Sequence, residues 1–319
     1  MRRITKESTM AGSAAVIGAG MAGLSCATRL VEEGWHVTLF DKGRGPGGRM
    51  ASKVVTAQGM TFAFDYGAQY LTARDPNFIA QVARWAGQGV VARWSAAGED
   101  GWVGVPGMNA LVAHMAAELD IRWSTHIRAL WRDGDGWRLG HDELAEGPFD
   151  VAILALPAEQ TADLAAPIDS TLSGLAKAHP SDPCWTVLLG FETGLSAPDR
   201  VSACDPIDWA ARNTAKPGRS GGEAWTIHAT PDWSLRHMDS DRLSVTASLL
   251  RALEERVGML PIPVHATAHR WRYARSGKAG VGAYHRRDTG LAACGDWLIA
   301  PRVESAWLSG RQAAERVIA

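Results

Sequence analysis

Three glycines and one aspartate near the start of the chain have the types and spacing needed to bind a dinucleotide. Gly18, Gly20 and Gly23 form a G-x-G-x-x-G pattern. In such a pattern the first glycine permits a tight turn, the second lets the backbone approach a diphosphate, and the third allows a helix to pack on a strand. Asp41 follows Gly23 by 18 residues, where a carboxylate can accept hydrogen bonds from both hydroxyls of an adenosine ribose.

A β-α-β unit is expected to position these residues. Apolar runs at residues 14–17 and 35–40 predict two strands, and the apolar spacing of residues 22–33 predicts a helix that ends at Gly34. The N-terminus of this helix would face the diphosphate with free N–H groups and a positive dipole end. An isolated glycine pattern is also found in other α/β loops, but the flanking strands, the helix and the acid together favour a dinucleotide site.

A second loop, residues 42–50, follows directly after the predicted ribose-binding strand. It contains several glycines together with Lys42, Arg44 and Arg49. A guanidinium group can bind a phosphate through two parallel hydrogen bonds, so Arg49 is a candidate for cofactor contact. The alternative is a solvated turn, and the position of the loop next to Asp41 favours the cofactor.

The composition excludes several classes of protein. The 319 residues carry a formal net charge of −1, so binding to nucleic acid or to an anionic membrane is not expected. No apolar run approaches the roughly 20 residues that span a bilayer. The 4 cysteines show no C-x-x-C spacing, which indicates reduced thiols in a cytoplasmic protein.

Residues 1–10 are interpreted as a disordered extension, with Met10 as an alternative start. Several of the 14 tryptophans are expected to line a pocket for a flat ligand.

The pattern changes after a buried parallel strand at residues 150–156. An alanine-rich helical stretch follows at 158–178, and residues 158–287 are interpreted mostly as a second domain with an antiparallel sheet. Its predicted elements are strands at 184–191, 224–229 and 264–273 and a helix at 243–257. The chain closes with a strand that ends in Gly295-Asp296 and a last helix to Ile318.

The glycine pattern, the acid, the Gly47-Gly48-Arg49 sequence and the C-terminal Gly-Asp and helix together resemble the flavin amine oxidase superfamily. The resemblance implies the α/β, two-domain FAD-binding fold of the amine oxidase and p-hydroxybenzoate hydroxylase type, with a Rossmann-like FAD domain and an antiparallel-sheet substrate domain. Residues 11–75, 100–157 and 288–319 would form the discontinuous FAD domain. Residues 76–99 and 158–287 would form the substrate domain.

The same resemblance implies a set of cofactor-binding residues. They are Gly18, Gly20, Met21, Ala22, Gly23, Asp41, Lys42, Gly48, Arg49, Met50, Ala68, Gln69, Ile127, Pro157, Asp296, Val303, Glu304 and Ala306. Members with covalent flavin attach it through a cysteine in the C-terminal segment. Residues 303–310 contain no cysteine, which predicts noncovalent FAD.

Longer blocks resemble bacterial renalase-type flavoproteins. They include FDKGRGPGGRM at 40–50, DYGAQYLTARD at 65–75, DWAARN at 208–213, WTIHAT at 225–230 and AHRWRYAR at 268–275. The resemblance implies an FAD-dependent oxidase for misreduced 2-dihydro and 6-dihydro isomers of NAD(P)H. Hydride would pass to flavin N5, NAD(P)+ would form, and O2 would reoxidise the flavin to give H2O2.

The renalase resemblance also implies a substrate pocket in which no side chain acts as a base, because hydride transfer from a dihydropyridine releases no proton. The expected substrate-binding residues are Tyr70, Leu71, Thr72, Ala73, Arg74, Trp185, Asn213, His228 and Trp271. When the sequence around His228 is considered alone, the alternative interpretation is a core histidine whose hydrogen bonds are satisfied.

Two other functions stay open at the level of the sequence. One is a flavin-dependent amine oxidase or desaturase for a small hydrophobic substrate, and the other is a noncatalytic FAD-binding sensor. His265 and His269 have a metal-ligand spacing only on a helix, whereas their surroundings alternate like a strand, so no metal site is predicted. A monomer is expected.

Overall fold

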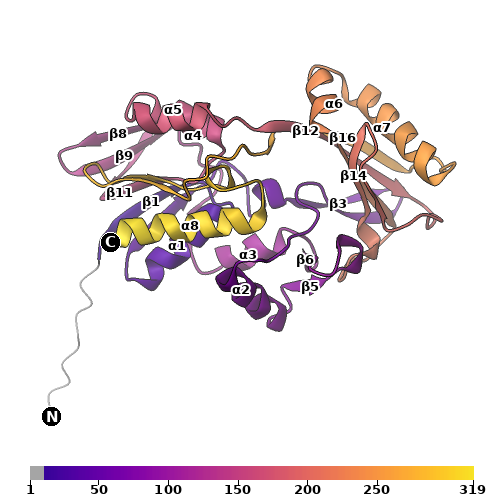
Figure 1. Cartoon of the computed structure of the whole chain (residues 1–319), viewed down its shortest axis with the longest axis horizontal. Coiled ribbons are helices and arrows are strands. Elements are labelled where there is room, and N and C mark those ends of the chain that lie inside the picture. The colour runs from indigo at the N-terminus through magenta and orange to yellow at the C-terminus, as the bar shows by residue number, and fades with distance from the viewer. Residues whose placement is uncertain (1–10) are drawn as a thin grey trace, which may run out of the picture.

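The computed structural model describes residues 11–319. The extension predicted for residues 1–10 lies outside the described residues. The two-domain α/β architecture expected from the sequence is confirmed, and the two domains form separate lobes that meet along one side (Figure 1).

A six-stranded sheet organises the first domain. Its order is β17-β18-β11-β1-β2-β7, and all neighbouring pairs are parallel except β17 with β18. The strands are β1 (Ser13–Ile17), β2 (His36–Phe40), β7 (Asp120–Arg122), β11 (Val151–Leu154), β17 (Tyr284–Arg286) and β18 (Leu291–Ala293). The apolar residues of β1, β2, β11 and β18 are buried on both faces, as expected for a covered parallel sheet. The predicted β-α-β opening is confirmed, with β1 at the centre of the sheet.

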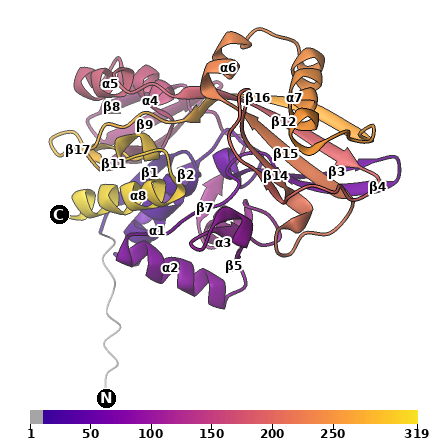
Figure 2. The same ribbon diagram turned by 45° about the vertical axis from the view of Figure 1, so that its right-hand side comes forward.

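Helices from distant parts of the sequence cover one face of this sheet. Helix α1 (Met21–Glu32) and the last helix, α8 (Val303–Ile318), lie side by side in both ribbon views (Figures 1 and 2). A side chain at Gly310 would overlap the carbonyl oxygen of Ala22, so the small residue permits this close approach. Helices α2 (Pro76–Gly87) and α3 (Ala110–Ala116) pack into the same core.

The other face carries a small antiparallel sheet and two short helices. The sheet contains β8 (Ala129–Asp133), β9 (Gly136–His141) and β10 (Leu144–Phe149), and the helices are α4 (Ala158–Ala165) and α5 (Ser170–Lys177). The register pairs Asp133 with Gly136, so a two-residue turn, Gly134-Asp135, joins β8 to β9.

The second domain is built on a five-stranded antiparallel sheet in the order β13-β14-β15-β12-β16. Its strands are β12 (Asp182–Phe191), β13 (Arg200–Val201), β14 (Ile207–Arg212), β15 (Glu223–Ala229) and β16 (His265–Arg275). Helices α6 (Pro231–Arg236) and α7 (Arg242–Val257) cover one face. The hairpin of β3 (Ser52–Ala57) and β4 (Met60–Asp65) reaches the other face, where Phe62 and Phe64 pack against Leu188.

Two of the predicted domain boundaries need correction. The resemblance implies that residues 76–99 belong to the second domain, but Phe78 and Trp85 are buried in the same core as Val16 and Trp307. The pair β5 (Val91–Arg93) and β6 (Trp102–Gly104) also spans the expected boundary at residue 99. Helices α4 and α5, predicted in the second domain, bury Ala158, Ala162 and Leu172 in the same core as Ala152 and Leu154 of the six-stranded sheet.

The remaining described elements are short 3-10 turns at Gly48–Met50, Ser95–Ala97, Asn213–Ala215 and Asp296–Leu298. Within residues 11–319 no helix is both long enough and apolar enough to cross a membrane. The same residues contain no cluster of His, Cys, Asp and Glu suited to a metal ion.

Candidate active site

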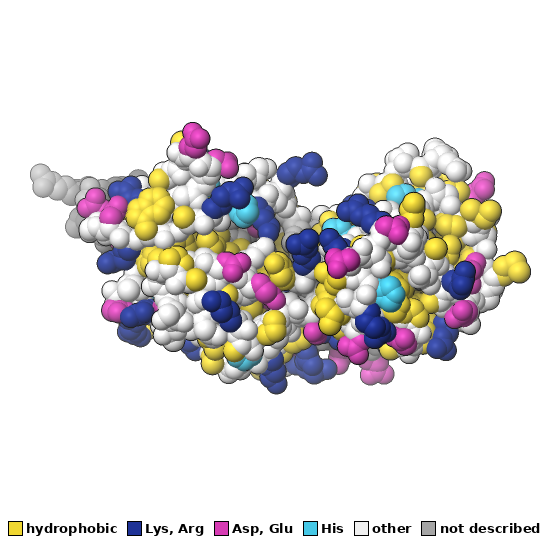
Figure 3. All heavy atoms as spheres, turned by 90° about the horizontal axis from the view of Figure 1, so that it is seen from above, with side chains coloured by type: hydrophobic (Ala, Val, Ile, Leu, Met, Phe, Trp, Pro, Cys, Tyr) yellow, Lys and Arg dark blue, Asp and Glu magenta, His cyan; other side chains and the backbone are white. Residues whose placement is uncertain are grey.

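A cavity of about 530 Å³ lies where the two domains meet. Seen from above, the molecule is hollowed between its lobes, and Lys and Arg side chains gather beside the hollow (Figure 3). The predicted site residues that line the cavity are Gly20, Met21, Ala22, Arg49, Met50, Ala68, Gln69, Tyr70, Leu71, Thr72, Arg74, His228, Trp271, Asp296, Val303 and Ala306. Residues that are far apart in the sequence therefore line the same cavity.

The backbone roles that the spacing predicts are seen at two of the three glycines, a tight turn at Gly18 and close helix packing at Gly23. Gly18 has a φ of 107°, and a side chain there would overlap the carbonyl oxygen of Ala155. A side chain at Gly23 would overlap the carbonyl oxygen of Gly18, so this glycine sets how closely α1 packs on β1. At Gly20 an added Cβ would meet nothing within 4 Å, and this residue lines the cavity.

The N-terminus of α1 opens onto the cavity beside Gly20. No side chain caps this helix, and its first turn holds no acidic residue. Met21 and Ala22 line the cavity with it. Free N–H groups at a helix N-terminus together with open space form a site for an anion such as a diphosphate.

Asp41 lies next to this turn but does not line the cavity itself. Its two carboxylate oxygens accept hydrogen bonds from the N–H groups of Ala19 and Gly43, each at 2.7 Å. The carboxylate therefore fastens the glycine turn to the loop after β2. Each oxygen keeps a second lone pair, so a ribose hydroxyl can still donate to it.

Arg49 and Asp296 form a bidentate ion pair, with N–O distances of 2.6 and 2.9 Å. Arg49 comes from the loop after β2, and Asp296 follows β18, so the pair joins the two ends of the sequence inside the cavity wall. The pair leaves a donor and an acceptor side by side, because each group has more hydrogen-bonding capacity than its partner uses.

Glu304, predicted to bind the cofactor, does not line the cavity. Its Oε1 accepts hydrogen bonds from the N–H groups of Arg74 and Asp75, at 2.6 and 2.7 Å. The Glu304 side chain therefore fixes the end of loop 65–75 against α8, and the contact of this residue with the cofactor stays a prediction. Its neighbours Val303 and Ala306 line the cavity at the first turn of α8.

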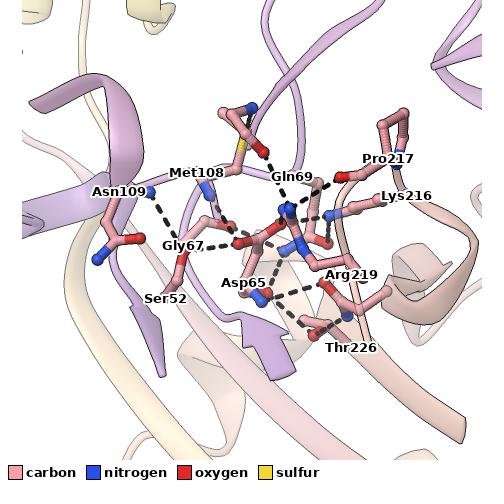
Figure 4. A network of polar contacts seen from close by, with 12 residues as sticks. Ser52, Asp65, Gly67, Gln69, Met108, Asn109, Lys216, Pro217, Arg219 and Thr226 are labelled. Atoms are coloured by element: carbon pink, nitrogen blue, oxygen red, sulfur yellow. Dashed lines mark hydrogen bonds and ion pairs between the residues drawn. The ribbon is translucent and has the colours of Figure 1, made fainter. Parts of the chain in front are cut away.

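The start of the same loop is held by a buried charge network around Asp65, which is inaccessible to solvent. Asp65 Oδ2 accepts hydrogen bonds from Lys216 Nζ at 2.9 Å and from Arg219 Nη2 at 2.5 Å. Figure 4 shows both cations and Gln69 converging on Asp65. Burial alone would raise the pKa of Asp65, but the two cations lower it to about 2. Burial lowers the pKa of Lys216 to about 8, although Asp65 opposes this shift.

The side chain of Gln69 is fully used within this network. Its Nε2 donates to the carbonyl groups of Asp65 and Gly67, at 2.6 and 3.1 Å, and its Oε1 accepts from Lys216 at 3.0 Å. The prediction that Gln69 binds the cofactor is therefore corrected for its side chain, which holds the loop in shape. The residue still forms part of the cavity wall.

Flat aromatic rings form much of the opposite wall. The Tyr70 ring stacks on Trp209, with centroids 5.1 Å apart and planes 28° apart. Trp271 stacks on Tyr66 at 5.3 Å and donates its Nε1–H to the Tyr66 carbonyl at 2.9 Å. These contacts fix the ring planes, so the wall is a rigid surface for a planar ligand.

Two titratable groups in the cavity wall are held in neutral form. Burial lowers the pKa of His228 to about 4, although a hydrogen bond to the Tyr66 carbonyl opposes the shift. Burial raises the pKa of the Cys184 thiol to about 12. Near neutral pH the wall therefore presents an uncharged imidazole and a protonated thiol.

Two predicted substrate residues face elsewhere. Alternate residues of a strand point to opposite faces, and Trp185 points toward α6 and α7, where its Nε1 donates to the His237 carbonyl at 2.9 Å. Its neighbour Cys184 lines the cavity instead. Asn213 is fully buried and bonds to Thr226 Oγ1 at 2.7 Å and to the N–H of Asp65 at 3.0 Å. Both predictions are corrected to structural roles.

Several other predicted residues also lie outside the lining. They are Gly18, Gly23, Asp41, Lys42, Gly48, Ala73, Ile127 and Pro157. Ile127 is buried in the core beneath the six-stranded sheet, and Pro157 precedes α4.

The structure also adds lining residues that the sequence did not single out. They include Ala155, Leu156, Cys184, Asp208, Trp209, Arg275, Gly295 and Arg302. Trp209 and Asp208 stand in the DWAARN block and Arg275 ends the AHRWRYAR block, so the regions were identified but the facing residues were not. The bulge at residue 208 changes which residues of β14 face the cavity.

Comparison with known families and proteins agrees with this arrangement. Residues 16–85 match the family described as NAD(P)-binding Rossmann-like domain, and residues 86–318 match the family described as flavin containing amine oxidoreductase. Lysine-specific histone demethylase 1 homolog 3 of Oryza sativa subsp. indica is 36% identical over 85 residues, which cover 27% of this chain and 10% of that protein. Protein FLOWERING LOCUS D of Arabidopsis thaliana is 35% identical over 75 residues, or 24% of this chain and 10% of that protein.

Solved structures share the fold over nearly the whole chain. A provisionally assigned protoporphyrinogen oxidase from Exiguobacterium sp. 255-15 has a TM-score of 0.77 and 12% identity, covering 97% of this chain and 99% of that one. Cyclohexylamine oxidase from Brevibacterium oxydans IH-35A has a TM-score of 0.72 and 11% identity, with coverages of 96% and 98%. A putrescine oxidase has a TM-score of 0.69 and 14% identity, with coverages of 96% and 99%. At these identities the likeness shows the fold alone.

The residues of the site fit a bound FAD. The open space at Gly20 and the uncapped N-terminus of α1 suit a diphosphate, and the cavity continues past the Arg49–Asp296 pair to the aromatic wall. Residues 303–310 offer no cysteine for a covalent link. With most of its length matched, the chain belongs to the flavin containing amine oxidoreductase family, and its cofactor is noncovalently bound FAD.

Proposed function

We propose that the protein is an FAD-dependent oxidase that converts the 2-dihydro and 6-dihydro isomers of NAD(P)H to NAD(P)+. FAD, when bound, supplies the hydride acceptor and passes the electrons to O2, giving H2O2. The proposal rests on the resemblance of the sequence blocks and, above all, on the charge of the cavity wall.

The cavity wall carries an excess of positive charge. Its two carboxylates are paired, Asp296 with Arg49 at 2.6 Å and Asp208 with Arg275 at 2.8 Å. Arg74 and Arg302 also line the cavity, and neither has a carboxylate partner among residues 11–319. Such a wall favours anionic ligands, which include the FAD diphosphate and a dinucleotide substrate, over a cationic amine.

The aromatic surface supports the same substrate class. A dihydronicotinamide ring is planar, and the rings of Tyr70, Trp209 and Trp271 offer a flat surface fixed by stacking. Glu304 and the Asp65 network hold loop 65–75 at both ends, so Tyr70 is kept in place. Orientation of this kind is what a hydride transfer requires of the protein.

Loss of hydride from a dihydropyridine gives an aromatic cation and releases no proton. The site therefore needs no general base. Neither His228, with its pKa lowered to about 4, nor Cys184, with its pKa raised to about 12, is suited to that role near neutral pH. Both groups are consistent with a site that positions its substrate.

The test is anaerobic mixing of the purified holoenzyme with 2-dihydro-NAD and 6-dihydro-NAD. Either isomer is expected to reduce the flavin on mixing and so bleach its visible absorption band. Admission of air should then restore the band with formation of H2O2. Ordinary 4-dihydro-NAD is the matched control and should bleach the flavin far more slowly. Bleaching by none of the isomers would overturn the proposal.

A flavin-dependent amine oxidase is the second candidate. The observation that favours it is the uncharged His228 beside the aromatic rings of Tyr70 and Trp271, since an imidazole nitrogen can accept a hydrogen bond from an amine. In the same anaerobic experiment, bleaching by cyclohexylamine or another primary amine, with no response to the dihydronicotinamides, would establish this alternative.

A further inference from the structure

Arg74 and Arg302 come together at the mouth of the cavity, although they are far apart in the sequence. Both residues line the cavity, and both are exposed to solvent. Arg302 is the N-cap residue of α8. Glu304, in the first turn of this helix, accepts hydrogen bonds from the N–H groups of Arg74 and Asp75 at 2.6 and 2.7 Å. The backbone of Arg74 is therefore held against the start of α8, close to Arg302.

The protein does not neutralise these two guanidinium groups. Among the described residues, the two carboxylates that line the cavity already pair with other arginines, at 2.6 and 2.8 Å. Arg74 and Arg302 form no ion pair within residues 11–319. Two like charges held close together repel each other, and a bound anion relieves this repulsion. The mouth of the cavity is therefore suited to a negatively charged group.

This place is separate from the one that suits the cofactor diphosphate. The diphosphate fits the open space at Gly20, where α1 begins. Gly310 of α8 packs against Ala22 near that point. Val303 lies seven residues earlier in α8, which is about 10 Å along the helix axis. The start of α8 is thus displaced from the start of α1, so Arg302 is left for a second anionic group.

Arg74 lies on the same loop as the aromatic ring of Tyr70, which also lines the cavity. The Cα atoms of residues four positions apart are separated by at most about 14 Å. The loop is fixed at its two ends by hydrogen bonds to Asp65 and Glu304. A nicotinamide nucleotide carries its first phosphate on the ribose attached to the ring. A nicotinamide ring against Tyr70 can therefore present this phosphate to Arg74.

We propose that Arg74 and Arg302 bind the phosphate group next to the nicotinamide ribose of the substrate. A guanidinium group offers parallel N–H donors that match two phosphate oxygens, and two such groups can hold one phosphate from two sides. The inference rests on the proposed function for the identity of the substrate. The anion site itself rests on the two arginines without ion-pair partners and on their position at the cavity mouth.

The kinetic test compares two substrates that have the same ring and differ in this phosphate. They are the 6-dihydro forms of nicotinamide mononucleotide and of nicotinamide riboside. We expect kcat/KM of the holoenzyme to favour the mononucleotide by about tenfold at low salt. Raising the ionic strength from about 0.01 M to about 1 M shortens the Debye length from about 30 Å to about 3 Å, and it should reduce this preference.

Arginine variants test the two side chains. Arg74→Gln and Arg302→Gln should each reduce the preference for the mononucleotide by about threefold, and the double variant should abolish it. Arg302→Lys retains the charge and should keep more of the preference than Arg302→Gln. A preference that is unchanged in both glutamine variants would overturn the proposed phosphate site.

Arg272→Gln is the matched control, because it removes the same net charge from the protein. Arg272 is an exposed arginine that follows Trp271 on β16. Alternate residues of a strand point to opposite faces, and Trp271 lines the cavity whereas Arg272 does not. This variant should leave the preference unchanged. A loss as large as that in Arg302→Gln would show an effect of net charge alone and would contradict a local site.

Two further measurements exclude other uses of the arginines. The affinity for FAD should be unchanged in Arg74→Gln and Arg302→Gln, and weaker FAD binding with an unchanged preference for the mononucleotide would assign the arginines to the cofactor instead. The 2′-phosphate of 6-dihydro-NADP lies at the adenosine end of the substrate. Both glutamine variants should therefore affect 6-dihydro-NAD and 6-dihydro-NADP equally, and an effect confined to 6-dihydro-NADP would refute the assignment to the phosphate near the ring.

Binding of oxidised fragments separates this inference from the proposed function. Calorimetric titration of the holoenzyme with nicotinamide mononucleotide and with nicotinamide riboside needs no turnover. Tighter binding of the mononucleotide that is lost in the double variant would support the phosphate site even if no dihydronicotinamide reduced the flavin. Equal affinity for the two fragments would overturn the site even if 6-dihydro-NAD were oxidised.

Discussion

Asp65 is a fully buried carboxylate at the junction of the two domains, and two cations from the second domain hold it in its charged form. Lys216 and Arg219 approach the same oxygen, and Ser52 donates to the other at 2.6 Å. Taking charges out of water is costly, and the cost is offset only while all partners are present. The residue therefore connects the stability of the interface to the shape of loop 65–75.

Replacing Asp65 with Asn should destabilise the protein strongly, because Lys216 and Arg219 would then be buried without an opposing charge. We expect a loss of about 3–5 kcal/mol in the free energy of unfolding, measured by denaturant titration. Lys216→Met is the informative control, since it leaves Asp65 paired with Arg219 and should cost less. A smaller loss for Asp65→Asn than for Lys216→Met would contradict the assigned role.

The same carboxylate predicts a response to acid. The pKa of Asp65 is about 2 in the folded protein and 3.8 in its ordinary state, so its contribution to stability is present above about pH 4. That contribution is lost as the pH falls from about 4 through 2, because the unfolded state binds the proton first. In stability curves measured across this range, Asp65→Asn should fall less steeply with acid than the unchanged protein.

At the level of elements, the glycine turn between β1 and α1 separates two functions of one motif. Gly23 governs how α1 packs on the turn, whereas Gly20 leaves room at the helix N-terminus. The two positions are three residues apart but face opposite environments, one packed and one open. Matched substitutions can therefore separate folding from cofactor binding.

Gly23→Ala should lower the stability of the protein even without FAD, because the new methyl group would overlap the carbonyl oxygen of Gly18. Gly20→Ala should leave the stability of the apoprotein within about 1 kcal/mol, since its Cβ would stand in open space at an unstrained φ of −82°. It should instead weaken FAD binding, because the methyl group points at the place of the diphosphate. Thermal melting without FAD and titration of flavin fluorescence measure the two effects, and equal behaviour of the variants in both assays would count against this division.

The sequence predicted the parts of the site that depend on local pattern. Gly18, Gly20 and Gly23 could be assigned because their roles follow from backbone geometry within one turn. Trp185 was assigned to the cavity wrongly, since β12 is buried on both faces and its apolar run does not reveal which residues face the ligand. Trp209 was missed because a bulge in β14 sets the direction of its side chain. The hydrogen bond of the Gln69 side chain could not be predicted either, because its donor, Lys216, is 147 residues away. Long-range charge pairs of this kind leave no periodic signal.

Considered as a whole, the molecule builds one cavity from parts of the sequence that lie far apart. Gly20 and Arg49 come from the N-terminal part of the cavity wall, and Asp296 and Val303 come from the C-terminal part. A ligand that binds only the folded state stabilises it by mass action. FAD should thus stabilise the whole arrangement, including the contact between α1 and α8.

Removal of FAD should lower the melting temperature. At a free FAD concentration about 100 times its Kd, the gain is about 2.7 kcal/mol, which corresponds to roughly 5 °C for a chain of this size. Differential scanning fluorimetry of apoprotein and of apoprotein with added FAD measures the shift. Acid precipitation of the holoenzyme should leave all the yellow colour in the supernatant, and colour retained in the pellet would contradict noncovalent binding.

The packing of α8 against α1 has a consequence for how the protein is made. Residues 303–318 leave the ribosome after every strand of the six-stranded sheet, yet Gly310 must lie against Ala22 and Arg49 must meet Asp296 before the cavity wall is complete. The nascent chain can form β1, α1 and β2 early but has no finished pocket until α8 has left the ribosome. Capture of the flavin therefore waits for residues 303–318, and ribosome-bound chains that stop before Val303 should emerge colourless.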